Sequence, residues 1–194
     1  MGRKRTIDRN VTMEAIESVV RQSGIAGLSI DAVAKEAGIS KSSVVYDFQN
    51  KNQLLAAFIK SRIDEKRANI ARAAEAREGE PNAWLRALLD CSCTPPSEED
   101  MATAMVISAG TGTNDVCRTL MREAFNEDVC RILSQSDDPR SARLSWLALN
   151  GLLSMEYFGF HTFSEAERQQ ILTDIAWLMS GEPDTSLSNP QVQK

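Results

Sequence analysis

The chain has 194 residues, a formal net charge of −5 and four cysteines, a size that fits one large globular domain or two small ones. No apolar core follows its charged N-terminus, and its longest apolar stretch, 144–160, is too short and polar to cross a membrane. We therefore expect a cytoplasmic protein with no membrane partner and with free thiols, and the net charge taken alone argues against a nucleic-acid binder.

The first predicted helix runs from Thr12 to Ser23. Ile16, Val19 and Val20 lie on one face at helical spacing, and Gly24 follows the last turn. This pattern is typical of a helix that covers a small core.

The segment from Ile30 to Lys51 has the spacing of two helices joined by a tight turn. Gly38 stands at the corner, where the chain needs a left-handed conformation that other residues resist, and Ser40 is placed to cap the second helix. The inward positions of this template are held by Val33, Ala34, Ala37, Ile39 and Val44. A short turn containing Gly is what a helix-turn-helix requires, so the segment predicts a short helix in the DNA major groove.

The residues left outside this template are short, polar or cationic, which favours DNA binding over an ordinary helical hairpin. Ser29 can cap the first helix, and Lys51 begins the helix that follows the motif. The predicted DNA-contacting residues are Ser29, Ser40, Lys41, Ser42, Ser43, Tyr46 and Lys51.

Asn50 and Gln53 have the spacing of a capping box, which predicts the start of the next helix. Apolar residues at helical spacing follow it: Leu54, Leu55, Phe58, Ile59 and Ile63. We expect three helices and the start of a fourth to share one small core.

The phrase LSIDAVAKEAGISKSSVVYDFQNKNQLLAAF resembles the N-terminal domain of the tetracycline-repressor (TetR) family of transcriptional regulators. The resemblance spans Asn10 to Phe58. The family often has S-K-G-T-L-Y-Y-x-F around its recognition helix, and this chain departs from that pattern at Ser42, Val45 and Asp47. A carboxylate at position 47 would repel phosphate, so Val45 and Asp47 are not counted as DNA contacts.

Charge is distributed unevenly along the chain. Residues 1–62 hold ten Lys and Arg against six Asp and Glu, and residues 63–194 hold twelve against twenty-one. A basic N-terminal part on an acidic body suits a DNA-binding protein. Gly2-Arg3-Lys4-Arg5 is either an arm that reaches phosphates or a minor groove, or a solvated tail.

Beyond Arg62 the pattern stays helical. We expect breaks at 79–81, 94–96, 110–112, 136–139, 159–163 and 181–183, which gives an all-α protein of about nine helices. Ser97 with Asp100 and Ser164 with Glu167 have capping-box spacing, and Asp138 precedes Pro139 at a helix start. The predicted domains are 1–62, a helix-turn-helix DNA-binding domain, 63–181, a ligand-binding and dimerisation domain, and 182–194, a disordered tail.

Two C-terminal helices, from Pro139 to about Gly159 and from Ser164 to Ser180, are candidates for a dimer interface. The first is apolar nearly all round and must be covered on every side. The family resemblance implies a four-helix interface between two copies, and a fully internal core helix is the alternative. The interface residues predicted on these helices are Leu144, Ala148, Gly151, Leu152, Met155, Ile171, Ile175, Leu178 and Met179.

The family resemblance also implies a pocket for a small effector among the middle helices. Met and aromatic side chains there suit an irregular, largely apolar cavity, although each residue alone is more simply explained as core. The predicted lining is Trp84, Leu88, Met101, Met105, Met121 and Phe125.

The sequence offers little from which to build an enzyme: it has one His, no nucleophile elbow, no metal-ligand spacing and no Gly-rich loop after a strand. We expect no cofactor and no metal. The resemblance implies a ligand-responsive repressor that binds a palindromic double-stranded operator as a homodimer. The alternative is a helical dimer of the same fold that binds a ligand or acts as a scaffold without a role in transcription.

Overall fold

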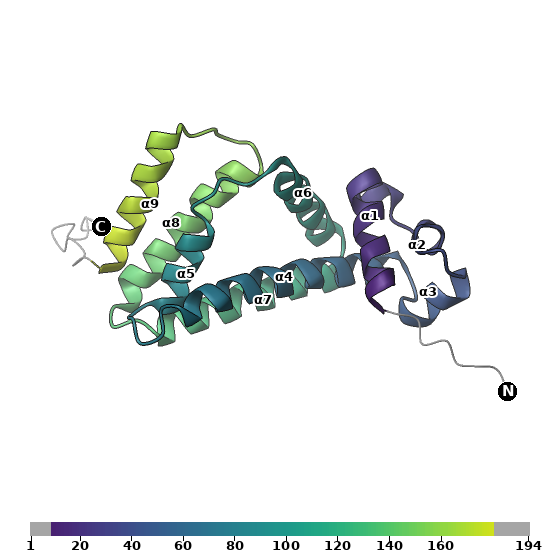
Figure 1. Cartoon of the computed structure of the whole chain (residues 1–194), viewed down its shortest axis with the longest axis horizontal. Helices are drawn as coiled ribbons and strands as arrows, with labels where there is room; N and C mark the ends of the chain where they lie inside the picture. Colours follow the sequence, from purple (N-terminus) through teal and green to yellow (C-terminus); the bar gives the residue numbers. More distant parts are fainter. Residues whose placement is uncertain (1–8, 181–194) are drawn as a thin grey trace, which may run out of the picture.

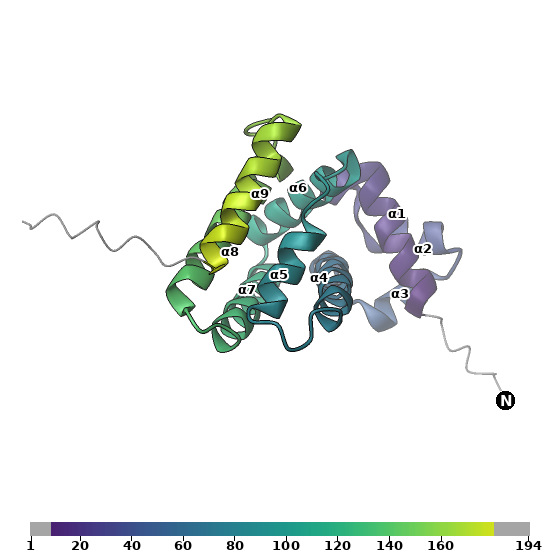
Figure 2. The same ribbon diagram turned by 60° about the vertical axis from the view of Figure 1, so that its left-hand side comes forward.

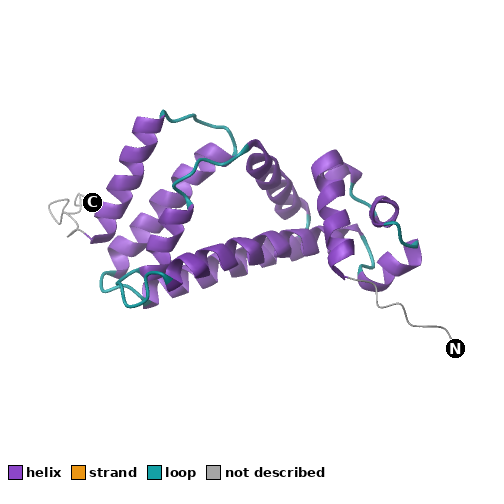
Figure 3. Cartoon of the chain, viewed as in Figure 1, coloured by secondary structure: helices purple, strands orange, loops and turns teal. Residues whose placement is uncertain are grey.

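The computed structural model describes residues 9–180, and within them it contains nine α-helices and no strand (Figures 1 and 3). This confirms the all-α prediction; the N-terminal Gly2-Arg3-Lys4-Arg5 segment, the 181–183 break and the 182–194 tail lie outside the described residues. The helices are α1 Arg9–Gly27, α2 Ile30–Ala37, α3 Lys41–Asp47, α4 Lys51–Glu75, α5 Ala83–Cys91, α6 Glu98–Thr113, α7 Asp115–Ser134, α8 Pro139–Tyr157 and α9 Glu165–Ser180.

Helices α1–α3 and the first half of α4 enclose one core. Helix α1 starts earlier than predicted, and Gly24 breaks its regular geometry with φ 59° and ψ −165°, which fits the predicted stop after Ser23. The fully buried side chains of this core come from all four helices and the α1–α2 connection: Ile16, Leu28, Val33, Val44, Leu54 and Ile59.

A second core lies at the other end of α4. Helices α4 and α7 run side by side along one edge of the molecule, and α5, α8 and α9 pack at the end far from α1–α3 (Figures 1 and 2). The largest fully buried side chains there are Ile70, Leu85, Ile132 and Leu149.

The two cores are connected by more than the α4 backbone. Helix α4 runs without a break through residue 62, where the sequence suggested a domain boundary. Cys117 of α7 is fully buried in the first core, and Val106, Ile107 and Met121 of α6 and α7 pack against it. A movement of α6 or α7 would therefore displace side chains that pack against the helix-turn-helix unit, that is, α1–α3 and the first half of α4.

The predicted helix starts are confirmed in hydrogen bonds. Ser97 accepts from the Asp100 backbone N–H at 3.2 Å, while the Asp100 carboxylate accepts from the Ser97 N–H at 2.9 Å. Ser164 and Glu167 form the same reciprocal pair at 3.3 and 2.8 Å. Asp138 caps α8, which has Pro139 in its first turn.

The predicted break at 110–112 is wrong. Helix α6 continues to Thr113, and the chain turns at Asn114, which caps α7. Gly110 is present for a packing reason, because a Cβ there would lie 3.1 Å from Leu55 Cδ2 and 3.2 Å from Ile59 Cδ1. The glycine thus lets α6 approach α4 closely. A glycine that is required by helix packing looks the same in the sequence as one that ends a helix.

None of the helices within residues 9–180 is long and apolar enough to cross a membrane. No group of three or more His, Cys, Asp or Glu gathers as a metal site in this range.

Candidate nucleic-acid interface

Helices α2 and α3 form the predicted helix-turn-helix. Ser29 caps α2 by accepting from the Ala32 N–H at 3.1 Å. Gly38 adopts the left-handed conformation, with φ 62° and ψ 30°, and the Ile39 N–H then donates to the Ala34 carbonyl at 3.0 Å. This is the glycine-dependent helix ending that the sequence predicted.

Helix α3 is anchored from one side and open on the other. Val44 is fully buried beneath it and Phe48, at its C-terminal end, is 5% exposed. On the outer side Lys41, Ser42 and Tyr46 are exposed, Tyr46 to 82%. A short helix fixed by its inner residues and solvent-exposed on its outer face has the placement that groove reading requires.

Three serines gather at the start of α3. The Ser40 Oγ accepts from the Ser43 N–H at 3.2 Å. The same oxygen shares hydrogen bonds with Ser42 Oγ at 2.9 Å and with Ser43 Oγ at 2.7 Å. Ser43 is half-buried, so of these two predicted DNA-contacting serines Ser42 is the more accessible.

The two predicted cationic contacts differ in their surroundings. Lys41 Nζ lies 2.9 Å from the Asp31 carboxylate, a partner that the sequence did not suggest. Lys51 is half-buried at the first turn of α4, and its Nζ donates to the Ala26 carbonyl at 3.5 Å. Among the described residues, no carboxylate forms an ion pair with the Lys51 ammonium.

The start of α4 differs in detail from the predicted capping box. Asn50 accepts from the Gln53 N–H at 3.1 Å, as expected. The Gln53 side chain, however, accepts from the Gln49 N–H at 2.8 Å, one residue before the cap. The link between α3 and α4 is therefore fixed over a longer stretch than the motif implies.

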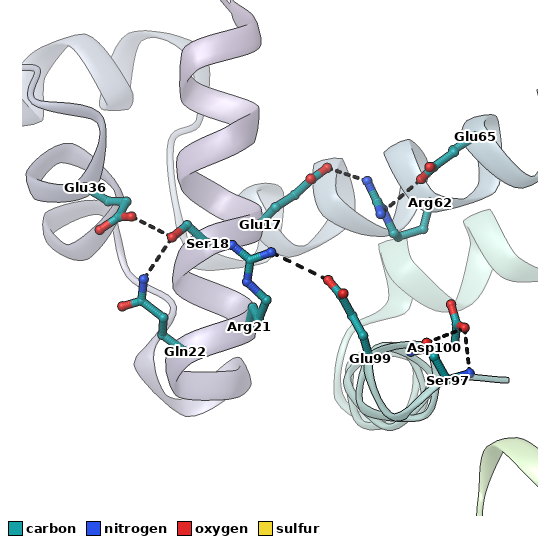
Figure 4. A network of polar contacts seen from close by, with 10 residues as sticks. All are labelled: Glu17, Ser18, Arg21, Gln22, Glu36, Arg62, Glu65, Ser97, Glu99 and Asp100. Carbon is teal, nitrogen blue, oxygen red and sulfur yellow. Dashed lines mark hydrogen bonds and ion pairs between the residues drawn. The ribbon is translucent and has the colours of Figure 1, made fainter.

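Polar side chains connect helix α1 to α4 and to α6 (Figure 4). Arg62 of α4 lies between Glu17 of α1 at 2.6 Å and Glu65 at 3.0 Å. Arg21 of α1 reaches across to Glu99 of α6 at 3.6 Å, with both side chains largely exposed. Exposed pairs of this kind contribute little stability, but they connect α1 to α4 and α6.

The six residues predicted to line a pocket are not brought together. Trp84 and Leu88 are buried in the second core, Met121 packs against the first, and Met105 and Phe125 are exposed. Met101 lies beside Gly159. The described chain has hollows elsewhere, a shallow one lined by Asp115, Val116, Thr119 and Leu120, and a small one lined by Val129, Ile132, Leu133, Arg143 and Trp146.

The nine residues predicted for a dimer interface divide into three sets by exposure. Leu152, Ile175 and Met179 lie in the core of the chain itself, at 3–5% exposure. Ile171 and Leu178 are half-buried. The exposed members all lie on α8, where Leu147, which the prediction omitted, joins them: Leu144, Ala148, Gly151 and Met155.

A helix-turn-helix with an open recognition helix, attached to a larger helical unit, defines a DNA-binding protein of the regulator class. Residues 11–58 match the family model of bacterial regulatory proteins of the tetR family, and residues 82–179 match the tetracyclin repressor-like C-terminal domain. The second match alone covers half of the chain, so the chain belongs to the TetR family of DNA-binding transcriptional regulators. Members of this family are regulators and not enzymes.

Solved structures share the fold across most of the chain. A candidate transcriptional regulator from Streptomyces coelicolor A3(2) is 20% identical, with 89% of this chain and 98% of that chain covered and a TM-score of 0.72. The multidrug binding protein EbrR complexed with malachite green is 19% identical, with 89% and 98% covered and a TM-score of 0.69. A protein from Saccharomonospora viridis in complex with choline is 18% identical, with 86% and 93% covered and a TM-score of 0.65. No curated protein matches the chain in sequence.

Proposed function

We propose that this chain is a cytoplasmic, ligand-responsive repressor that binds a palindromic operator as a homodimer. The observation that carries the proposal is the outer face of α3, where exposed Lys41, Ser42 and Tyr46 stand on a helix whose inner residue Val44 is fully buried. Such a helix presents side chains to base edges in a fixed orientation.

The dimer is supported by one face of α8. Its exposed apolar residues follow each other at helical spacing, and nothing beyond the neighbouring residues and backbone of α8 lies within 4 Å of the position that a Cβ on Gly151 would take, which leaves room for a second helix. An exposed apolar line of this kind indicates an interface. Two-fold symmetry then matches two half-sites one helical turn apart, about 34–36 Å. The line consists of Leu144, Leu147, Ala148, Gly151 and Met155.

The effector we propose is a small, largely apolar molecule bound among the helices between Pro81 and Phe158. Structural relatives are complexed with malachite green and with choline. Because the six candidate residues are divided between two cores and the surface, the effector would select a conformation in which these helices are rearranged. A ligand that binds the two conformations unequally shifts the population between them.

Calorimetry tests this coupling once an effector has been found by thermal-shift screening. By thermodynamic reciprocity, operator DNA must weaken effector binding by the same factor by which the effector weakens DNA binding. Equal effector affinity with and without operator would show that the effector does not regulate DNA binding.

A helical dimer without a role in transcription is the second candidate, favoured by exposed Val45 and Asp47 on α3. Selection of bound sequences from random DNA with the purified protein, followed by footprinting, separates the two. A protected palindrome supports the repressor, whereas recovery of no sequence above background supports the second candidate.

A further inference from the structure

Lys41, the one cation of the recognition helix α3, lies against a carboxylate of the preceding helix. Its Nζ is 2.9 Å from Asp31 Oδ1 and 3.0 Å from Asp31 Oδ2. The backbone holds the two residues close, because the Ser29 cap fixes the first turn of α2, which carries Asp31, and Gly38 turns the chain back. With Asp47 at its last position, α3 has no net charge.

Other cations of the helix-turn-helix unit are engaged in the same way. Arg21, Lys60 and Arg62 each lie within ion-pair distance of an acidic side chain. Lys35 and Lys51 form no ion pair within the described part of the chain. Between residues 10 and 62 only two cations, Lys35 and Lys51, are therefore left without an ion pair, and the recognition helix contributes neither of them.

We propose that Asp31 is an affinity-setting residue that weakens the sequence-independent part of DNA binding by holding Lys41, an inference that rests on the proposed function. Contacts of lysine with phosphate release counterions and give affinity that falls with salt and ignores sequence. A phosphate that approaches Lys41 competes with the Asp31 carboxylate for the ammonium. Both side chains are largely exposed, at 63% and 71%, and an exposed pair is weak. Asp31 therefore reduces the affinity several-fold without abolishing the contact.

The Asp31→Asn variant should bind duplex DNA roughly 1.5- to 5-fold more tightly, the range that an exposed ion pair allows. The gain should be equal for a selected site and for random duplex, because phosphate contacts carry no sequence information. The slope of log affinity against log salt should steepen by up to about 0.9, the value of one phosphate contact.

A double-mutant cycle assigns the effect to Lys41. In the Lys41→Gln background Asp31→Asn should raise affinity much less, because no ammonium is left to release. Lys35 provides the matched control: it is exposed, lies one turn beyond Asp31 on α2, and is not paired with it in the structure. Asp31→Asn and Lys35→Gln should therefore be additive.

The stability of each variant is measured as well, because Asp31 lies in the first turn of α2, where an acid interacts favourably with the helix dipole. Asp31→Ser serves as a second neutral variant, and thermal melting of both variants is followed by circular dichroism. Both variants should keep the helical signal and give the same gain.

Elution from heparin, a polyanion without bases, separates failure of this inference from failure of the proposed function. If the wild-type chain binds no duplex, the proposed function falls, and the salt concentration of elution across the same cycle still shows whether Asp31 masks Lys41. Equal gains from Asp31→Asn in both Lys41 backgrounds would overturn the inference, since Asp31 would then act by direct repulsion. Coupling to Lys35, or a gain confined to the selected site, would overturn it as well.

Discussion

Among residues 10–62, Lys51 is the one on which we expect the electrostatic part of DNA binding to depend most. It begins α4 beside the recognition helix, and no carboxylate in the described part of the chain pairs with it as Asp31 pairs with Lys41. Among residues 10–62, six Lys and Arg stand against five Asp and Glu, so the surplus of positive charge there is one. Most of the basic surplus of residues 1–62 belongs to the first nine residues, which hold four Lys and Arg and one Asp.

The Lys51→Gln variant should bind every duplex more weakly, and the slope of log affinity against log salt should become shallower by about 0.9. The loss should exceed that of Lys41→Gln, because the Lys41 charge is already offset by Asp31. Fluorescence anisotropy at several salt concentrations measures both.

Lys60→Gln is the matched control for this prediction. Lys60 is exposed on the same helix and pairs with Asp64 at 2.6 Å, so its removal should leave the slope unchanged. If neither Lys51→Ala nor Tyr46→Ala changed the affinity for a selected site, the placement of the DNA interface on α3 would be wrong.

At the level of single residues, sequence reasoning succeeded where the signal was local. Gly38, Ser29 and Ser40 act through neighbours within five residues, and all three were identified. The partner of Lys41 was missed because Asp31 lies ten residues away on another helix, and its reach depends on the angle between α2 and α3.

Helix α6 shows how one glycine controls the approach of two elements. Gly110→Ala adds a Cβ that lies only 3.1 and 3.2 Å from Leu55 Cδ2 and Ile59 Cδ1, and these two side chains, 2% and 0% exposed, would have to shift within the core. Overpacking costs about 1–3 kcal/mol, whereas the gain in helix propensity is about 1 kcal/mol. The variant should therefore unfold with a free energy about 1 kcal/mol lower, measured by urea denaturation.

Gly112→Ala is its control on the same helix. Nothing beyond the neighbouring residues and backbone of α6 lies within 4 Å of the added Cβ, so only the propensity gain remains and stability should rise by up to about 1 kcal/mol. Equal effects of the two substitutions would show that the contact with α4 does not constrain α6.

Helix α9 is held to α8 and to the α5–α6 connection by one buried side chain. Arg168, 5% exposed, lies 2.7 Å from the Glu156 carboxylate and donates to the carbonyls of Ser92 and Cys93 at 2.6 Å each. Nothing in the sequence indicates this cluster, because its members are up to 76 residues apart.

The Arg168→Met variant should lose about 3–5 kcal/mol of stability, since it leaves a buried carboxylate without its partner. Glu156→Gln should cost less, because Arg168 keeps the two carbonyl acceptors. Urea denaturation of both variants measures the difference. A larger loss from Glu156→Gln would contradict the role given to the carbonyls.

At the scale of the whole molecule, the all-α class and the helix-turn-helix followed from periodicity and capping residues, while the relation between the two units did not. The first core takes Cys117, Val106 and Ile107 from the C-terminal part of the chain, and no local pattern marks such long-range packing. The same limit applies to α8: its sequence is apolar nearly all round, and only the fold separates the inward Leu152 from the outward Leu147.

That separation gives a test of the proposed dimer in which assembly and folding are measured independently. Leu147 is 52% exposed on the outer line of α8, so Leu147→Asp should leave the chain folded but turn the dimer into a monomer, because a charge would be buried at the interface. Met105 is 57% exposed on another helix, α6, and Met105→Asp should remain dimeric. Leu152→Asp, in contrast, places a charge in the core of the chain and should unfold it. Sedimentation at micromolar concentration, together with the helical signal in circular dichroism, distinguishes these outcomes. A wild-type chain that sediments as a folded monomer would contradict the proposed dimer. It would also remove the two-fold symmetry that the palindromic operator is proposed to match.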